Sequence, residues 1–201
     1  MSTFADLGLR NDLLHIEADR DILRGAIPEA ELSEVLQSVT EDLHHVQHWV
    51  SGGTALGLIR DGALIPTDSD VDLCFLADWD NPPPLDEFPA MLEAVGGRLF
   101  RTTTYDGKPS QVAGLVKGRI LDFYYCYSGL EPGFLWMLAQ GACIRKPAHL
   151  IANRALVDTP LGAFWLPQPA EEYVEWRYGT MWRTPESDIS IWGNTPARRT
   201  W

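Results

Sequence analysis

The chain is poor in basic residues. It contains 16 Lys and Arg against 28 Asp and Glu, and its formal net charge is −12. A protein that binds nucleic acid gains affinity by neutralising phosphates with Lys and Arg, and adsorption to an anionic membrane surface depends on the same residues. We therefore expect no nucleic-acid partner. A small nucleotide is compatible with this charge, because a metal ion and a few local donors can offset it.

Cysteine and long apolar runs are scarce as well. The cysteines, Cys74, Cys126 and Cys143, are odd in number and form no C-x-x-C pair, which argues against a disulfide framework and a zinc–thiolate site. Cys74 and Cys126 lie in apolar runs and are expected to be small buried residues. The N-terminal residues lack the apolar core of a secretory signal, and no run approaches the ~20 apolar residues of a membrane span. We therefore expect a cytoplasmic protein without an integral membrane segment.

The hydrophobic pattern predicts an α+β fold, in which a small mixed β-sheet is flanked by helices. The length suits one domain, which we assign to residues 28–185, with an N-terminal extension over 1–27 and a C-terminal tail over 186–201. A short amphipathic helix is expected within the extension, over Ala5–Leu23. Further helices are expected after Pro28 and over 54–62, 86–95 and 170–179; strands are expected around 48–51 and over 71–77, 98–105, 110–116 and 119–127, with a hairpin turn at Lys117-Gly118.

Two carboxylates lie on one face of the predicted strand 71–77. Asp70 and Asp72 point the same way because side chains alternate along a strand, and their charges repel each other unless a cation lies between them. Mg2+ prefers oxygen ligands and binds one or two carboxylates together with substrate phosphates. Asp122, in the apolar strand 119–127, is a third candidate ligand, because an unpaired charge there would be costly. The sequence therefore predicts a Mg2+ or Mn2+ site at Asp70, Asp72 and Asp122.

A turn of small residues, Ser51-Gly52-Gly53-Thr54, precedes this strand. Glycine has no Cβ, so Gly52 and Gly53 would let backbone amides approach an anion closely. Thr54 would add its amide and hydroxyl at the positive end of the next helix, and Arg60 near the end of that helix would reach a phosphate as a guanidinium fork. We therefore expect Gly52, Gly53, Thr54 and Arg60 to bind the phosphates of a nucleotide.

Each of these features also has a simpler interpretation when taken alone. A Gly-Gly pair is usually only a turn, an Asp-x-Asp on a strand edge is usually solvated, and Asp122 could cap a turn or pair with an arginine. Arg60 alone would be a surface cation, and Asp68 is interpreted as a turn residue rather than as a further ligand. The Gly-Gly turn, the following helix and the carboxylates on the next strand occur together in this order, and this combination favours a site that binds a metal and a phosphate.

Two further clusters have weaker functional interpretations. His44 and His48 share a helix face at i and i+4, but the glutamate of a metalloprotease motif and a third ligand are missing, so packing or solvated histidines are expected. Tyr173, Trp176 and Tyr178 form an aromatic cluster whose expected role is core packing. A platform for a choline-like cation is the alternative for that cluster.

The run 51–75, SGGTALGLIRDGALIPTDSDVDLCF, resembles the nucleotidyltransferase-fold signature of the LicD/fukutin-related family. Residues 53–60 match that family's Gly-Thr-Leu-Leu-Gly-x-x-Arg stretch, and residues 65–72 match its Ile-Pro followed by an acidic cluster. The family's downstream Ile-Asp-Ile-Phe corresponds to residues 121–123, and its Val-Pro-x-Pro, Tyr, Leu, Tyr-Gly ending resembles residues 166–185.

The resemblance spans residues 45–185 with two departures. Thr67-Asp68-Ser69-Asp70 stands where the family often has Trp-Asp-Asp-Asp, so one acidic position is missing. The chain also lacks a cysteine cluster like the zinc-binding insertion of the fukutin-related proteins. The short region after Asp72 suggests a minimal version of the fold.

The resemblance implies a nucleotidyltransferase-like fold and a Mg2+-dependent transfer of a substituted phosphate. Phosphocholine or a polyol phosphate would pass from a CDP-linked donor to a hydroxyl of a glycan or small acceptor. Asp70 and Asp72 would hold the metal, Asp122 would complete the metal site or act as base, and residues 52–54 would grip the donor diphosphate. Two alternatives stay open. One is transfer of a nucleoside monophosphate from an NTP to a small-molecule or protein hydroxyl, and the other is a non-catalytic nucleotide-binding pseudoenzyme.

Overall fold

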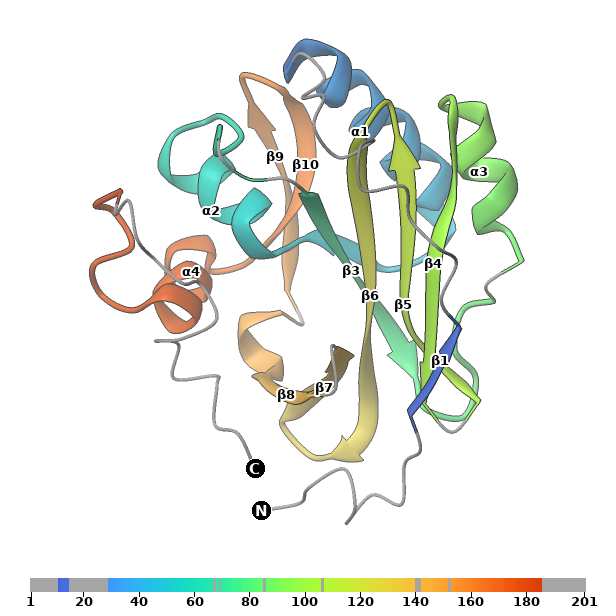
Figure 1. Ribbon diagram of the computed structural model, residues 1–201. Coiled ribbons are helices and arrows are strands. Elements are labelled where there is room, and N and C mark those ends of the chain that lie inside the picture. Colours follow the sequence, from blue (N-terminus) through green and yellow to red (C-terminus); the bar gives the residue numbers. More distant parts are fainter. Residues whose placement is uncertain are drawn as a thin grey trace.

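The computed structural model describes residues 11–14, 29–66, 68, 70–84, 86–105, 107–139, 142–151 and 153–185. These residues form an α+β fold with an eight-stranded mixed sheet and a separate two-stranded sheet (Figure 1). Along the chain the elements are β1 (Asn11–Leu14), α1 (Glu29–Asp42), the 3-10 helix η2 (Leu43–His45), β2 (His48–Val50), α2 (Gly52–Arg60), β3 (Asp70–Asp78), α3 (Phe88–Ala94), β4 (Gly97–Tyr105), β5 (Lys108–Val116), β6 (Arg119–Glu131), β7 (Phe134–Ala139), β8 (Ala142–Pro147), the 3-10 helix η3 (Ala148–Leu150), β9 (Arg154–Thr159), β10 (Gly162–Pro167) and α4 (Ala170–Tyr178).

β3 and β6 form the centre of the large sheet. They pair in parallel, and this register places Asp72 directly opposite Asp122. β2 pairs antiparallel with β3, while β5, β4 and β1 continue the sheet beyond β6 in antiparallel pairs. β7 pairs with the second half of β6, beyond the last residue that pairs with β5, and β8 pairs with β7.

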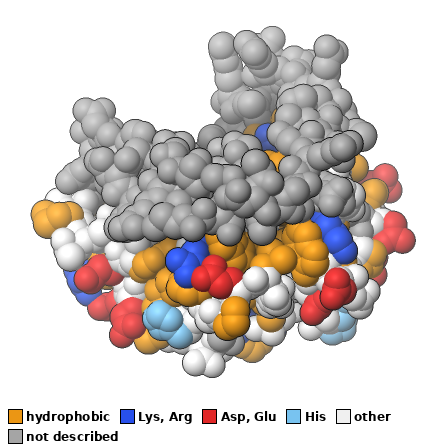
Figure 2. Space-filling view, turned by 90° about the horizontal axis from the view of Figure 1, so that it is seen from below, with side chains coloured by type: hydrophobic (Ala, Val, Ile, Leu, Met, Phe, Trp, Pro, Cys, Tyr) orange, Lys and Arg blue, Asp and Glu red, His pale blue; other side chains and the backbone are white. Residues whose placement is uncertain are grey.

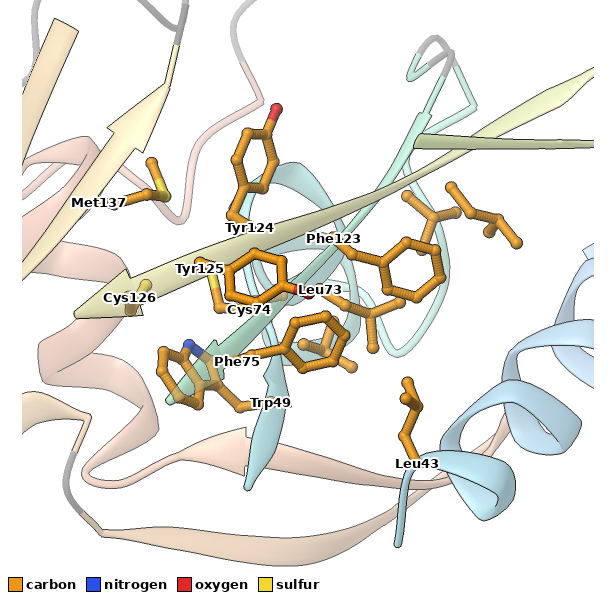
Figure 3. Packing of buried hydrophobic residues seen from close by; sticks show 14 of the residues in the cluster. Leu43, Trp49, Leu73, Cys74, Phe75, Phe123, Tyr124, Tyr125, Cys126 and Met137 are labelled. Carbon is orange, nitrogen blue, oxygen red and sulfur yellow. The ribbon is translucent and has the colours of Figure 1, made fainter. Parts of the chain in front are cut away.

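The two faces of the central strands differ in character. Leu73 and Phe75 of β3 are fully buried on one face, where the Phe75 ring stacks on Phe123 at 5.7 Å and meets Phe88 of α3 at 5.5 Å. Figure 3 shows Tyr124 projecting away from Phe123 and Phe75. In Figure 1, α2 and α4 lie beside each other, away from α1 and α3. One face therefore carries the aromatic core, and the carboxylates lie on the other.

The surface formed by the described residues carries charges of both signs. The view from below shows hydrophobic side chains interspersed with Lys or Arg and with Asp or Glu (Figure 2). None of the helices in the described residues combines the length and the apolar character that crossing a bilayer requires.

Most of the predicted elements are confirmed. The apolar positions that follow Pro28 lie on α1 and are buried, among them Leu32, Leu36 and Val39. The predicted hairpin joins β5 to β6 through Lys117 and Gly118, whose φ values of 47° and 83° match the two-residue turns that suit the twist of a hairpin. Cys74 and Cys126 are both fully buried, as expected.

The structure differs from the predictions in four places. β1 lies inside the segment Ala5–Leu23 that was expected to be helical, because antiparallel pairing with β4 outweighs its local amphipathic pattern. The rest of that segment and the tail 186–201 lie outside the described residues. The sheet extends further than predicted through β7 and β8, and β9 with β10 forms a hairpin that the sequence pattern left unassigned. α2 begins at Gly52 and not at Thr54, because glycine accepts the φ of +56° found there.

Truncating Phe75 to alanine tests how much the aromatic face stabilises the fold. We expect Phe75→Ala to lower the free energy of unfolding by about 3–5 kcal/mol, because it empties a fully buried site between three rings. Urea denaturation measures this difference. Leu156→Ala, at a side chain that is 56% exposed, serves as the control and should change stability by less than about 0.5 kcal/mol. Equal effects of the two substitutions would contradict the assignment of the core.

Candidate active site

Three carboxylates meet at the centre of the large sheet. Asp70 and Asp72 point to the same face of β3, and Asp122 extends from the paired position on β6. One carboxylate oxygen from each lies within 4.8 Å of those of the other two. Among the described residues, no other group of three His, Cys, Asp or Glu side chains comes this close. The structure therefore brings together the three aspartates that the sequence singled out.

The Gly-Gly turn packs directly against these carboxylates. A Cβ on Gly52 would lie 1.7 Å from Asp72 Oδ2, and one on Gly53 would lie 2.1 Å from Asp68 Oδ2. Gly52 also has φ +56°, a conformation that residues with a side chain rarely adopt. Gly52 is thus required by its φ and by its close approach to Asp72, whereas a side chain at Gly53 would have to displace the Asp68 carboxylate.

Two hydrogen bonds donated by backbone amides hold this turn in place, one accepted by a backbone carbonyl and one by a side-chain hydroxyl. The Ser51 N–H donates to the Asp72 carbonyl at 2.9 Å, and the Asp72 N–H donates to Thr54 Oγ1 at 3.0 Å. The first amides of a helix have no acceptor within the helix, so the start of α2 presents donors beside the carboxylates. The Thr54 hydroxyl itself is buried and ties α2 to β3.

Asp122 pairs with an arginine, as its simpler interpretation from the sequence allowed, and has further partners that the sequence did not reveal. The residue is 3% exposed. Gln111 of β5 donates to Oδ1 at 2.7 Å, and Arg101 of β4 donates to the same oxygen at 3.2 Å. The Tyr124 hydroxyl donates to Oδ2 at 3.4 Å. Oδ1 is thus held by two donors and Oδ2 by a third, longer one, which restrains the orientation of the carboxylate.

Burial and repulsion between charges disfavour the ionised forms of Asp68, Asp72 and Asp122. Burial raises the pKa of Asp72 well above its ordinary value, and the charges of Asp70 and Asp122 add to the effect. Burial also raises the pKa of Asp122 to about 6, although the Arg101 guanidinium opposes the shift. Burial, together with a hydrogen bond and repulsion from Asp70, raises the pKa of Asp68 to about 7. A bound cation would relieve this accumulation of charge, and an all-oxygen donor set suits Mg2+ or Mn2+.

A cavity of about 80 Å3 opens between the turn and the carboxylates. Gly52, Gly53 and the carboxylates of β3 line one part of it, and Lys146 of β8 and Arg177 of α4 line another. Asp68, interpreted from sequence as a turn residue, lines this cavity too. The acidic and the basic side chains therefore come from separate elements and share one small space.

Arg60 and the histidines lie elsewhere. The Arg60 guanidinium pairs with Asp61 at 2.6 Å, and Arg60 is not among the described residues that line the cavity. His48 Nδ1 lies 2.9 Å from the Val46 carbonyl, and His44 Nδ1 lies 2.9 Å from the Glu41 carbonyl. The structure therefore places none of these side chains with the carboxylates.

The aromatic cluster is divided between the core and the cavity. Tyr173 is 1% exposed, and its hydroxyl lies 2.8 Å from Ser51 Oγ. Tyr178 lines the carboxylate cavity. A larger cavity of about 340 Å3 lies elsewhere, against Phe75, Phe88 and Met91. It includes none of the three aspartates, so its size does not make it the site of the chemistry.

The basic and amide side chains around the site escaped the sequence analysis because they come from strands and a helix distant along the chain. Arg101 and Gln111 lie on β4 and β5, each within an apolar or Thr-rich strand. One feature of the sequence could have pointed to Lys146. It lies two residues after the buried Ile144 on β8 and therefore on the same face of that strand, and lysine is rarely found at a buried position.

Comparison with known proteins agrees with this geometry. A family model described as "LicD/FKTN/FKRP, nucleotidyltransferase domain" matches residues 45–128. The matched segment contains the Gly52-Gly53 turn and all three aspartates. No curated protein matches the chain.

Two solved structures of the antibiotic-resistance factor ANT(2'')-Ia align with part of the chain. A solution structure aligns with a TM-score of 0.43 and 15% identity over 70% of this chain, and this chain spans 66% of its length. A crystal structure in complex with adenylyl-2''-tobramycin aligns with a TM-score of 0.34 and 16% identity over 58% of this chain and 68% of that one. The match of the family model, which contains the turn and the three aspartates, shows that residues 45–128 are similar to LicD-type nucleotidyltransferase domains.

Proposed function

We propose that the protein is a Mg2+- or Mn2+-dependent transferase. It moves a substituted phosphate, of the phosphocholine or polyol-phosphate type, from a CDP-linked donor to a hydroxyl of a glycan or small acceptor. The observation that carries the proposal is the gathering of Asp70, Asp72 and Asp122 against the Gly52-Gly53 turn. The LicD-family match over the same residues supports it.

The carboxylates would hold the metal, which would neutralise charge on the transferring phosphate and orient the reacting groups. The amides at the start of α2 would bind the donor phosphate at the positive end of the helix dipole. Gln111 and Arg101 would hold Asp122 in place through Oδ1. Asp122 would complete the metal site or accept the proton of the acceptor hydroxyl.

Transfer of a nucleoside monophosphate from an NTP is the second candidate, favoured by the nucleotidyltransferase description of the matching family model. The two reactions differ in what leaves. Phosphate-group transfer from a CDP-alcohol releases CMP, whereas nucleotidyl transfer releases pyrophosphate. A pseudoenzyme would bind nucleotide and release neither.

A donor screen tests the proposal directly. A ligand that binds the native state raises its melting temperature by mass action. We expect CDP-choline, CDP-glycerol or CDP-ribitol to raise the melting temperature when Mg2+ is present and to have little effect without it. A shift with the NTPs alone, together with pyrophosphate release, would replace the proposal by nucleotidyl transfer. No shift with any of these compounds would contradict both.

Asp72→Asn tests the metal site. The substitution preserves the shape of the side chain and removes a charge from the three-carboxylate cluster. We therefore expect Mn2+ affinity to fall by at least about 100-fold, because the loss of a ligand should cost more than the loss of a residue that only orients a ligand. Titration of Mn2+ followed by electron paramagnetic resonance measures this. Asp78→Asn is the matched control on the same strand, because Asp78 accepts backbone hydrogen bonds from Asp80 and Asn81 through Oδ1, which asparagine retains. Equal Mn2+ affinity in the parent and Asp72→Asn would rule out the assigned ligands.

The raised pKa of Asp68 makes the stability of the metal-free protein depend on pH. Its folded pKa of about 7 lies above the ordinary value near 4, so between about pH 4 and pH 7 the folded state binds protons more strongly than the unfolded state. Its contribution to stability therefore falls as pH rises through this range. Asp68→Asn removes the titration, and in EDTA we expect the variant to gain stability relative to the parent between pH 5 and pH 7.5. Urea denaturation at each pH measures the difference, and a parent that gains on the variant as pH rises would contradict the raised pKa.

A further inference from the structure

A buried cation lies on the β8 side of the carboxylate cavity. Lys146 is 3% exposed. Its Nζ donates to Cys74 Sγ at 3.5 Å, and the buried Cys126 also interacts with it. An ammonium group has three donors, and the sulfur of cysteine is only a weak acceptor. Burying such a charge is costly unless an opposite charge or strong acceptors compensate it. Burial lowers the pKa of Lys146, but the neighbouring sulfurs of Cys126 and Cys74 outweigh that effect and raise its pKa overall, so the side chain is a cation at the edge of the cavity.

A second cation shares this position. Arg177 of α4 is 8% exposed, lines the same cavity, and is close enough to Lys146 for the two positive charges to repel each other. An anion in the cavity would relieve the repulsion and would offer oxygen acceptors that are stronger than the cysteine sulfurs.

The cavity is thus divided by charge. Asp68, Asp70 and Asp72 line its acidic part, and Lys146 and Arg177 line its basic part. A metal ion held by the carboxylates would bind some oxygens of a diphosphate, and the basic part would bind others. Arg60, which the sequence favoured for this task, pairs instead with Asp61 at the end of α2.

We propose that Lys146, together with Arg177, binds the phosphates of the nucleotide-linked donor. This assignment rests on the proposed function. It makes Lys146 a substrate-binding residue supplied by β8, which lies outside the segment matched by the family model. Cys74 would then position the Lys146 ammonium, and the phosphates would be the second group that the ammonium contacts.

The test compares nucleotide binding with metal binding in Lys146→Met, which keeps the length of the side chain and removes the charge. We expect the variant to bind CDP in the presence of Mn2+ at least about 10-fold more weakly by calorimetry, because a charge-assisted contact is lost. Mn2+ alone, titrated by electron paramagnetic resonance, should bind at least as tightly as to the parent, because a neighbouring positive charge has been removed. Arg60→Met is the control and should leave CDP affinity within about twofold of the parent.

Inorganic pyrophosphate with Mn2+ separates this inference from the proposed function. If the parent binds pyrophosphate but not CDP, the proposed donor fails, and weaker pyrophosphate binding by Lys146→Met still supports the inference. If Lys146→Met binds both probes as well as the parent, the inference is overturned while the proposed function stands. A parent that binds neither probe overturns both. Circular dichroism checks folding, and if Lys146→Met does not fold, Arg177→Met provides the same comparison with the same expected losses.

Discussion

The parallel pairing of β3 with β6 is the constraint on which the site depends. Its register sets Asp72 opposite Asp122, so two strands about fifty residues apart along the chain contribute acids to one point. Side chains alternate along each strand, and therefore the same register that gathers the carboxylates on one face gathers Phe75 and Phe123 on the other. A shift of one residue in either strand would exchange the two sets. The core and the acidic site are consequently specified together.

Gathering acids at a sheet centre opposes folding, and the surrounding structure offsets this in two ways. The aromatic face buries large apolar side chains, which is the main favourable contribution to folding. Arg101 and Gln111 bond Asp122 within the protein, so its burial does not depend entirely on a metal. These donors also prevent the carboxylate from rotating. The site is therefore held in shape by the protein, and a cation would bind to carboxylates that are already in place.

Local sequence patterns were enough to single out Asp70, Asp72 and the Gly-Gly turn as candidate site residues. These residues occur within about twenty positions of one another, and their spacing along a turn, a helix and a strand predicts that they lie close together. Asp122 could be placed because a charge within an apolar strand demands a partner. Lys146, Arg101 and Gln111 could not be placed, because their proximity to the site follows from strand order and not from any motif. The same holds for β1, whose pairing with β4 overrides the local pattern. The roles assigned to Asp70, Asp72 and Asp122 stay predictions until metal binding is measured.

The small size of the cavity indicates that the residues that bind the phosphates differ from those that select the donor and the acceptor. Sites that enclose a whole small molecule measure roughly 300–1,000 Å3, whereas the space between the carboxylates and Lys146 measures about 80 Å3. Such a space accommodates a metal and phosphate oxygens but not a nucleoside or a sugar. On the proposed function, the base of the donor and the acceptor would therefore contact residues beyond the cavity. Residues such as Lys146 would then affect all donors alike, because every donor presents the same phosphates, and selection among donors and acceptors would depend on the surrounding surface.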